Sequence, residues 1–241
     1  MTLEHIEERR QLAAAFRWTA RLGMNEGIAN HYSLAVSPDG KKFLLNPYGT
    51  HWLRMKASDL VEIDADAPEK DVGADIDPTA VAIHGALHRH LPQARCVMHL
   101  HSKYATALAV LKDPTMPPID QNTMRFFNRV AVDDGFDGMG LGDEAERLAT
   151  RLGNRSVMIM GQHGVLVAGK NVADCFDTIY YFERAAETYI TALSTGRELN
   201  VASDAVAEKT ARQWEEYPDF ADKHLSAIRS VLDKEGADYA E

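Results

Sequence analysis

The stretch RCVMHLHSKYA, residues 95–105, joins an apolar run to two histidines that are separated by a single residue. The apolar run predicts a buried β-strand, and alternate side chains of a strand point to the same face of its sheet. His99 and His101 should therefore direct their imidazole rings to the same side. Two neutral imidazoles in this arrangement are either two ligands of a metal site or a chance pairing, and a third ligand elsewhere in the chain would decide between them.

The segments on either side of this strand have the pattern of helices. Before it, DPTAVAIHGALHRHLPQA (residues 77–94) begins with Asp77 and Pro78, a pair typical of a helix N-terminus, and the helical pattern ends near Pro92. After it, SKYATALAVL (residues 102–111) is again helical in pattern. A buried strand between two helices indicates an α/β protein.

The rest of the chain continues this alternation. Apolar runs on both sides of Pro38, Asp39 and Gly40 predict a β-hairpin. Further strands are expected within residues 58–64, 127–134 and 156–169, and further helices within 3–22, 142–153, 172–196 and, as a pair, 201–241. Since no Gly-, Ser- or Pro-rich linker divides the chain, we expect one domain over residues 1–241 with a mixed sheet between helix layers. Residues 201–241 should form a C-terminal helical extension that packs on the body or on another subunit.

Composition and charge exclude several classes of protein. The chain has 241 residues, a formal net charge of −10 and a pI near 5.5, which argues against nucleic acid or an anionic membrane as partner. No stretch reaches the roughly 18 continuous apolar residues of a membrane span, and the first residues lack the apolar core of a signal peptide. Cys96 and Cys175 both lie in apolar stretches, so no disulfide framework is expected. We therefore expect a cytoplasmic protein.

The candidate for a third metal ligand is His163, in MIMGQHGVLV (residues 158–167). This histidine lies between glycines at the predicted junction of two strands, where a side chain can reach a cleft. A single histidine on a strand is also commonly a hydrogen-bonded structural residue, so the residue types alone leave both interpretations open.

The order of the motifs resembles that of the class II aldolase/adducin family. The resemblance rests on VMHLHS (residues 97–102), on GQHGVLVAGKNVADCFDTIYYFERAAE (residues 161–187), and on the N-terminal stretch that begins at LGMNEGIANHYS; it covers roughly residues 5–200. It implies a three-layer α/β/α fold with a central mixed, largely antiparallel sheet, and commonly a homotetramer. It also implies that His99, His101 and His163 bind one divalent metal ion, for which zinc ranks ahead of manganese and iron.

The sequence departs from the aldolases of this family at the acid/base position. Those enzymes carry a Ser-Ser-Glu motif whose glutamate lies four residues before a histidine. The same stretch here is DPTAVAIH, and counting back from His84 places Ala80 at the glutamate position. A methyl group cannot transfer a proton, so the sequence does not predict the acid/base step of those aldolases.

The phosphate-binding positions of the family are altered as well. The Gly-Asn pair of its N-terminal region becomes Asn30-His31 here, and the Thr-Gly pair of the next turn becomes Tyr48-Gly49. We therefore expect a substrate that carries no phosphate. The residues expected to contact it are Asn30, His31, Tyr48, Gly49 and Thr79.

Loss of the glutamate with retention of three histidines favours decarboxylation. Retro-aldol cleavage needs a base for the β-hydroxyl proton, whereas carbon dioxide leaves without one and only a later proton donor is required. The resemblance extends to family members that decarboxylate hydroxylated aromatic or unsaturated carboxylic acids. Catalysis has no assigned residue; His31 and Tyr104 are candidates, together with Tyr48 and His51.

Three other interpretations stay open. They are a retro-aldolase that acts on a non-phosphorylated substrate, an adducin-like interaction module without catalysis, and a non-haem iron oxygenase.

Some sequence features are not assigned to the site. The histidines at 84, 88 and 90 are expected to be structural or at the surface, and Glu183 and Glu187 to be solvated or at a subunit interface. From a neighbouring subunit, the C-terminal segment could add Trp214, Tyr217 and His224.

Overall fold

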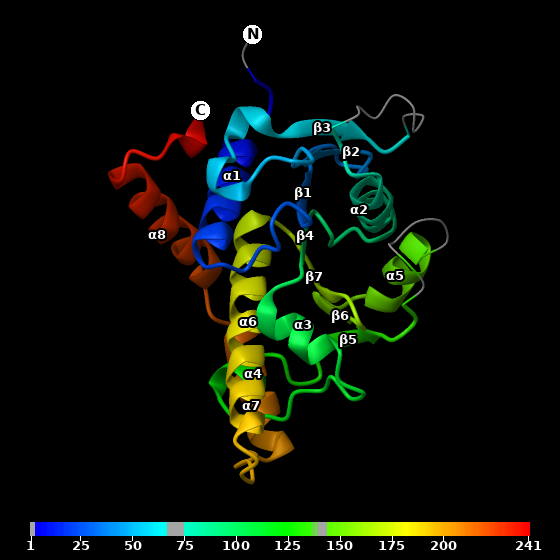
Figure 1. The fold of residues 1–241 in the computed structure, drawn as a ribbon, viewed down its shortest axis with the longest axis vertical. Coiled ribbons are helices and arrows are strands. Elements are labelled where there is room, and N and C mark those ends of the chain that lie inside the picture. The colour runs from blue at the N-terminus through cyan, green and yellow to red at the C-terminus, as the bar shows by residue number, and fades with distance from the viewer. Residues whose placement is uncertain (1–2, 67–74, 137, 139–143) are drawn as a thin grey trace.

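In the computed structural model, which describes residues 3–66, 75–136, 138 and 144–241, the chain forms a seven-stranded sheet between two layers of helices (Figure 1). The strands are β1 (His31–Ala35), β2 (Lys42–Leu45), β3 (Val61–Asp64), β4 (Cys96–Leu100), β5 (Val130–Asp133), β6 (Val157–Met160) and β7 (Gly164–Gly169). Their order is β3-β2-β1-β4-β7-β6-β5, and only the β5–β6 pair is parallel. This confirms the predicted mixed, largely antiparallel sheet.

Helices cover both faces of the sheet. One face packs against α1 (Ile6–Arg21), α3 (Lys103–Ala109) and α6 (Val172–Ser194), and the other against α2 (Pro78–His90) and α5 (Glu144–Leu152). The remaining helices are α4 (Gln121–Arg125), α7 (Asp204–Glu215), α8 (Phe220–Lys234) and the 3-10 turns η1 (Trp52–Arg54), η2 (Ala57–Asp59) and η4 (Asp238–Ala240). Helix α4 was not predicted from the sequence, although Asp120 and Thr123 form a capping box at its start.

The strands separate two hydrophobic cores by the alternation of their side chains. On β4, Met98 belongs to the core beneath α1 and α6, and its neighbour Val97 to the core beneath α2 and α5. His99 lies two residues from Val97, so it points to the α2 side of the sheet. The predicted start of α2 is confirmed, because the Asp77 carboxylate accepts a hydrogen bond from the backbone N–H of Thr79 at 2.9 Å.

The C-terminal helices pack on the body of the same chain. Helix α8 lies against α6 and α1, and α7 lies against α4 (Figure 1). Two of their side chains are fixed by a hydrogen bond and a cation–π contact: His224 Nδ1 lies 2.7 Å from Asp177 Oδ1, and the Arg125 guanidinium lies 5.1 Å from the centre of the Trp214 ring. Within the ranges that the structure describes, no helix combines the length and the apolar character needed to cross a membrane.

Candidate metal centre

The backbone brings His99, His101 and His163 to one edge of the sheet. His99 is on β4, His101 follows the end of that strand, and His163 lies in the turn between β6 and β7. Gly164 makes this approach possible, because a Cβ at this residue would lie 2.4 Å from the carbonyl oxygen of Leu100. The glycine after His163 is therefore a packing requirement of the turn.

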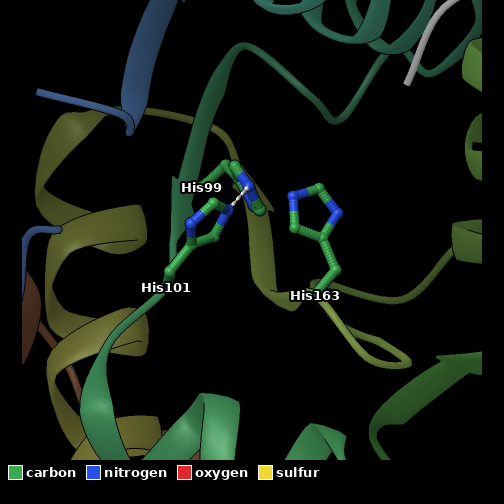
Figure 2. A group of neighbouring side chains, drawn as sticks. All are labelled: His99, His101 and His163. Atoms are coloured by element: carbon green, nitrogen blue, oxygen red, sulfur yellow. Dashed lines mark hydrogen bonds between the residues drawn. The ribbon is translucent and has the colours of Figure 1, made fainter. Parts of the chain in front are cut away.

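The three imidazole rings face a common point (Figure 2). One nitrogen of each ring lies within 4.8 Å of the others, and the His163 ring centre is 4.7 Å from those of both His99 and His101. The Nε2 atoms of His99 and His101 are 2.9 Å apart. Two nitrogens that are each about 2.1 Å from one metal ion lie about 3.0–3.4 Å apart at ordinary ligand angles, so the observed spacing suits a shared ion.

Hydrogen bonds leave Nε2 of His99 and His101 available to a metal. Nδ1 of His99 donates to the carbonyl oxygen of Val165 at 3.0 Å, and Nδ1 of His101 donates to the Glu26 carboxylate at 2.6 Å. Because each Nδ1 proton is donated to an oxygen, Nε2 is the nitrogen of each ring that can ligate a metal ion. The donor set therefore fits a divalent metal ion.

Burial keeps the imidazoles of His99 and His163 neutral, which is the form that binds metal. It lowers the pKa of His99 well below its usual value, and the neighbouring imidazoles of His31 and His163 lower it further. Burial also lowers the pKa of His163 to about 4, with a smaller contribution from His101. At neutral pH these two rings are therefore neutral, with no positive charge to oppose a cation.

A cleft of about 800 Å³ opens beside the three histidines. Of the residues predicted to contact a substrate, His31, Tyr48 and Thr79 line it. The Thr79 hydroxyl donates to Asp77 Oδ1 at 2.7 Å. The described residues of the cleft lining include no Lys or Arg, and two of them, Glu26 and Asp77, are acidic. The described lining residues therefore offer no positively charged side chain to a phosphate group.

The other predicted contact residues, Asn30 and Gly49, and the other catalytic candidates, His51 and Tyr104, are not part of the described cleft lining. Asn30 is 2% exposed, and its side-chain oxygen accepts a hydrogen bond from the backbone N–H of Glu26 at 2.7 Å. Gly49 and His51 line a separate hollow near Lys56. The backbone N–H of Tyr104 donates to Glu183. None of these four residues is among the described residues that line the cleft beside the histidines.

Several residues near the site were not assigned to it from sequence. Glu26 contacts His101, and His84 contacts His31. His84 and His88 are both buried, consistent with the expected structural role, whereas His90 is exposed and lies 2.9 Å from Glu146. The sequence feature that could have indicated a shared position for His84 and His88 is their spacing of four residues, which places both on the same face of the helix.

Glu183 corrects the expectation of a solvated or intersubunit carboxylate. It is 7% exposed, and it accepts hydrogen bonds from the Ser102 hydroxyl and from the backbone N–H groups of Tyr104 and Ala105. Glu183 therefore accepts the hydrogen bonds of backbone N–H groups in the first turn of α3, which would otherwise have no acceptor within the helix. Sequence periodicity could not reveal this role, because α3 and α6 are distant in the chain.

Comparisons with known proteins agree with this architecture. A family model for the Class II Aldolase and Adducin N-terminal domain matches residues 10–190. A putative aldolase class 2 protein of Caulobacter vibrioides is 31% identical over 210 residues, which cover 86% of this chain and 81% of that protein. The crystal structure of an aldolase II superfamily protein from Pseudomonas syringae matches with a TM-score of 0.90 at 32% identity, covering 100% of this chain and 98% of that chain.

Other matched proteins carry different functional names. Decarboxylase NovR of Streptomyces niveus is 26% identical over 204 residues, covering 83% of this chain and 75% of that protein. An adducin-related protein of Schizosaccharomyces pombe is 29% identical over 259 residues, covering 99% of this chain and 78% of that protein. The L-fuculose 1-phosphate aldolase of Glaciozyma antarctica matches with a TM-score of 0.82 at 21% identity, covering 100% of this chain and 96% of that one, which shows a shared fold alone.

Proposed function

This chain belongs to the class II aldolase and adducin family, and on that premise we propose that it is a metal-dependent carbon–carbon lyase that decarboxylates a small hydroxylated aromatic or unsaturated carboxylic acid. The observation that carries this proposal is the convergence of three imidazoles beside a cleft. His99, His101 and His163 would hold one divalent ion, foremost zinc, with manganese or iron as alternatives. Such an ion supplies Lewis-acid stabilisation of the negative charge that develops as the carbon–carbon bond breaks.

The position of Ala80 supports decarboxylation over aldol cleavage. Its side chain is 1% exposed and packs in an apolar cluster that includes Phe43, Leu45, Ile63 and Ile76. No proton-transferring group therefore stands at the position where the family's aldolases carry glutamate. The relative named decarboxylase, at 26% identity, is consistent with this choice.

The reaction needs little proton transfer from the protein. The bond between the carboxylate carbon and its neighbour breaks, carbon dioxide leaves, and the electron pair stays on the remaining carbon, which then takes up one proton. In the cleft, His31 offers a ring nitrogen to the substrate, and Tyr48 carries a hydroxyl that can donate the proton. The lack of Lys and Arg among the described lining residues favours a substrate whose single carboxylate is neutralised by the metal over a phosphate ester.

The oligomeric state and the cellular compartment of the protein are proposed as well. We propose a homotetramer, as is common in the family, acting on a small acid in the cytoplasm. The C-terminal segment leaves Val201, Val206 and Tyr217 more than 45% exposed, and a second copy of the chain could cover this apolar surface. Light scattering coupled to gel filtration would test the tetramer directly.

The test combines metal analysis with product detection. The purified protein is loaded separately with zinc, manganese and Fe(II) and is incubated with a panel of hydroxylated aromatic and unsaturated carboxylic acids. We expect one metal ion per chain and metal-dependent release of carbon dioxide. His163→Ala should abolish both, while His90→Ala, a change at an exposed histidine of α2, should preserve them.

The same experiment separates the alternatives. Release of an aldehyde without carbon dioxide would indicate a retro-aldolase, and consumption of oxygen with Fe(II) would indicate an oxygenase. A folded protein that binds none of the three metals would support an adducin-like interaction module and would refute the lyase.

A further inference from the structure

A chain of hydrogen bonds runs between the sheet and α2 and ends at the cleft. Its side chains are His31 and Ser33 on β1 and His84 and His88 on α2, each at most 5% exposed. Nδ1 of His31 lies 2.7 Å from Nε2 of His84, and Nδ1 of His84 contacts the Ser33 hydroxyl. That hydroxyl lies 2.7 Å from Nε2 of His88, whose Nδ1 lies 2.6 Å from the carbonyl oxygen of Ala94.

The carbonyl oxygen at the far end determines the position of every proton in this chain. Because the Ala94 oxygen can only accept, Nδ1 of His88 carries the proton and Nε2 of His88 is an acceptor. Ser33 must then donate its only hydroxyl proton to His88, and so it accepts from Nδ1 of His84. Nε2 of His84 is left unprotonated, and it accepts from Nδ1 of His31. Burial lowers the pKa of both α2 histidines, so neither carries a second proton at neutral pH that could reverse this order.

The last imidazole of the chain is at the cleft. His31 lines it, and the ring centre of His31 lies 5.0 Å from that of His99. The register of the sheet causes this proximity, since His31 and His99 are directly paired between β1 and β4. With Nδ1 committed to His84, Nε2 is the nitrogen that His31 can offer to a bound molecule.

We propose that this chain of hydrogen bonds fixes His31 with an unprotonated Nε2 toward the cleft, where it accepts a hydrogen bond from a hydroxyl group of the substrate. Ser33, His84 and His88 are positioning residues that act through His31. The inference rests on the proposed function, because it assumes that the cleft beside the metal site binds the substrate. It narrows the substrate to acids with a hydroxyl donor, since an ether oxygen at the same place would face the lone pair of Nε2 without a proton between them.

The proton positions can be measured directly in the metal-free protein. Nitrogen-15 chemical shifts of labelled histidines distinguish a protonated ring nitrogen from an unprotonated one. We expect His31, His84 and His88 all to carry the proton on Nδ1. In Ser33→Ala the order is no longer imposed, so part of the His31 population should move its proton to Nε2. A wild-type protein in which any of the three rings carries its proton on Nε2 would overturn the proposal.

Selectivity for a hydroxyl can be measured with two small acids, one with a hydroxyl donor and one in which a methyl group replaces the hydroxyl proton. Zinc-loaded protein is titrated with glycolate, which has a hydroxyl, and with methoxyacetate, in which a methyl ether replaces it. We expect the wild type to bind glycolate more tightly than methoxyacetate by roughly fivefold, the effect of one neutral hydrogen bond. Ser33→Ala should lose this preference while retaining zinc, and Ser37→Ala, at a half-buried serine just after β1, should keep it.

The outcomes separate this inference from the proposed function. If zinc binds but the wild type does not distinguish the two acids, the role of His31 is refuted and the metal-dependent lyase stands. If none of zinc, manganese and Fe(II) binds, the proposed function fails, and the nitrogen-15 shifts still decide whether His31 presents an unprotonated Nε2. If Ser33→Ala does not fold, the wild-type shifts and the wild-type preference for glycolate remain a complete test.

Discussion

The carboxylate of Glu183 on α6 accepts a hydrogen bond from the hydroxyl of Ser102 at 2.6 Å. Ser102 is the residue between His101 and α3, so this contact connects the segment that follows β4 to α6. The same carboxylate accepts from two backbone N–H groups in the first turn of α3. One buried acid therefore fixes the segment that carries two of the three candidate metal ligands.

Replacing Glu183 with alanine should destabilise the protein strongly. Glu183→Ala leaves a buried hydroxyl and two backbone N–H groups without their acceptor, so we expect the free energy of unfolding to fall by about 3 kcal/mol. Urea denaturation measures this change. Glu187→Ala, one turn further along α6 at a partly exposed ion pair with Arg184, is the matched control and should cost at most about 0.5 kcal/mol. Equal losses in the two variants would contradict the assigned role.

Glu26 should strengthen metal binding through His101. Its carboxylate accepts from Nδ1 of His101 at 2.6 Å, which fixes the orientation of the ring and raises the basicity of Nε2. We expect Glu26→Ala to weaken zinc binding roughly tenfold, measured by competition with a chelating dye. Glu8→Ala, at an exposed acid on α1, should leave the affinity unchanged. An affinity in Glu26→Ala equal to that of the wild type would show that the contact does not act on the metal.

Restoring the glutamate of the family's aldolases at position 80 should damage the fold. Because Ala80 lies in an apolar cluster, Ala80→Glu must either bury a carboxyl group or displace its neighbours. We expect a loss of about 3 kcal/mol in the free energy of unfolding and no gain of aldol cleavage. Ala82→Glu, at a half-buried position on the same helix, should be tolerated better. A stable Ala80→Glu protein with new aldolase activity would show that position 80 opens to the cleft.

The stability of the metal-free protein should fall on acidification between pH 6.5 and pH 4. Burial lowers the pKa of His88 from the 6.5 of an unfolded chain to about 4, and its hydrogen bond to Ala94 only partly opposes this. In that range the unfolded chain binds a proton at His88 that the folded chain does not, so stability falls by about 1.4 kcal/mol for each pH unit lost. Below pH 4 both states are protonated and this contribution no longer changes.

His88→Gln isolates that contribution. Urea denaturation at several pH values, with a chelator present, should show a pH slope smaller than that of the wild type by about 1.4 kcal/mol per unit between pH 6.5 and pH 4. Identical slopes in the two proteins would mean that His88 is not held neutral by burial.

The secondary structure was largely predictable because its signals are local. The apolar run at residues 95–101, the Asp77–Pro78 helix start and the long apolar periodicity of residues 172–196 each depend on neighbours in the chain, and each became the expected element. Helix α4 was missed because five residues carry too little periodicity. The expected strand at residues 58–64 is shorter, since its first part forms the turn η2 and β3 begins at Val61.

By itself, the sequence determined the fold class, the family and the identity of three histidines that could share a metal ion. Those features depend on residue types at fixed spacing. Only the tertiary structure decided which polar side chains reach the cleft: it placed His31 opposite His99, and it left Asn30 and Gly49 out of the described residues that line the cleft. The physical reason is that strand register and helix packing join residues distant in the chain, and a shift of one residue in the pairing of β1 with β4 would turn His31 to the other face of the sheet.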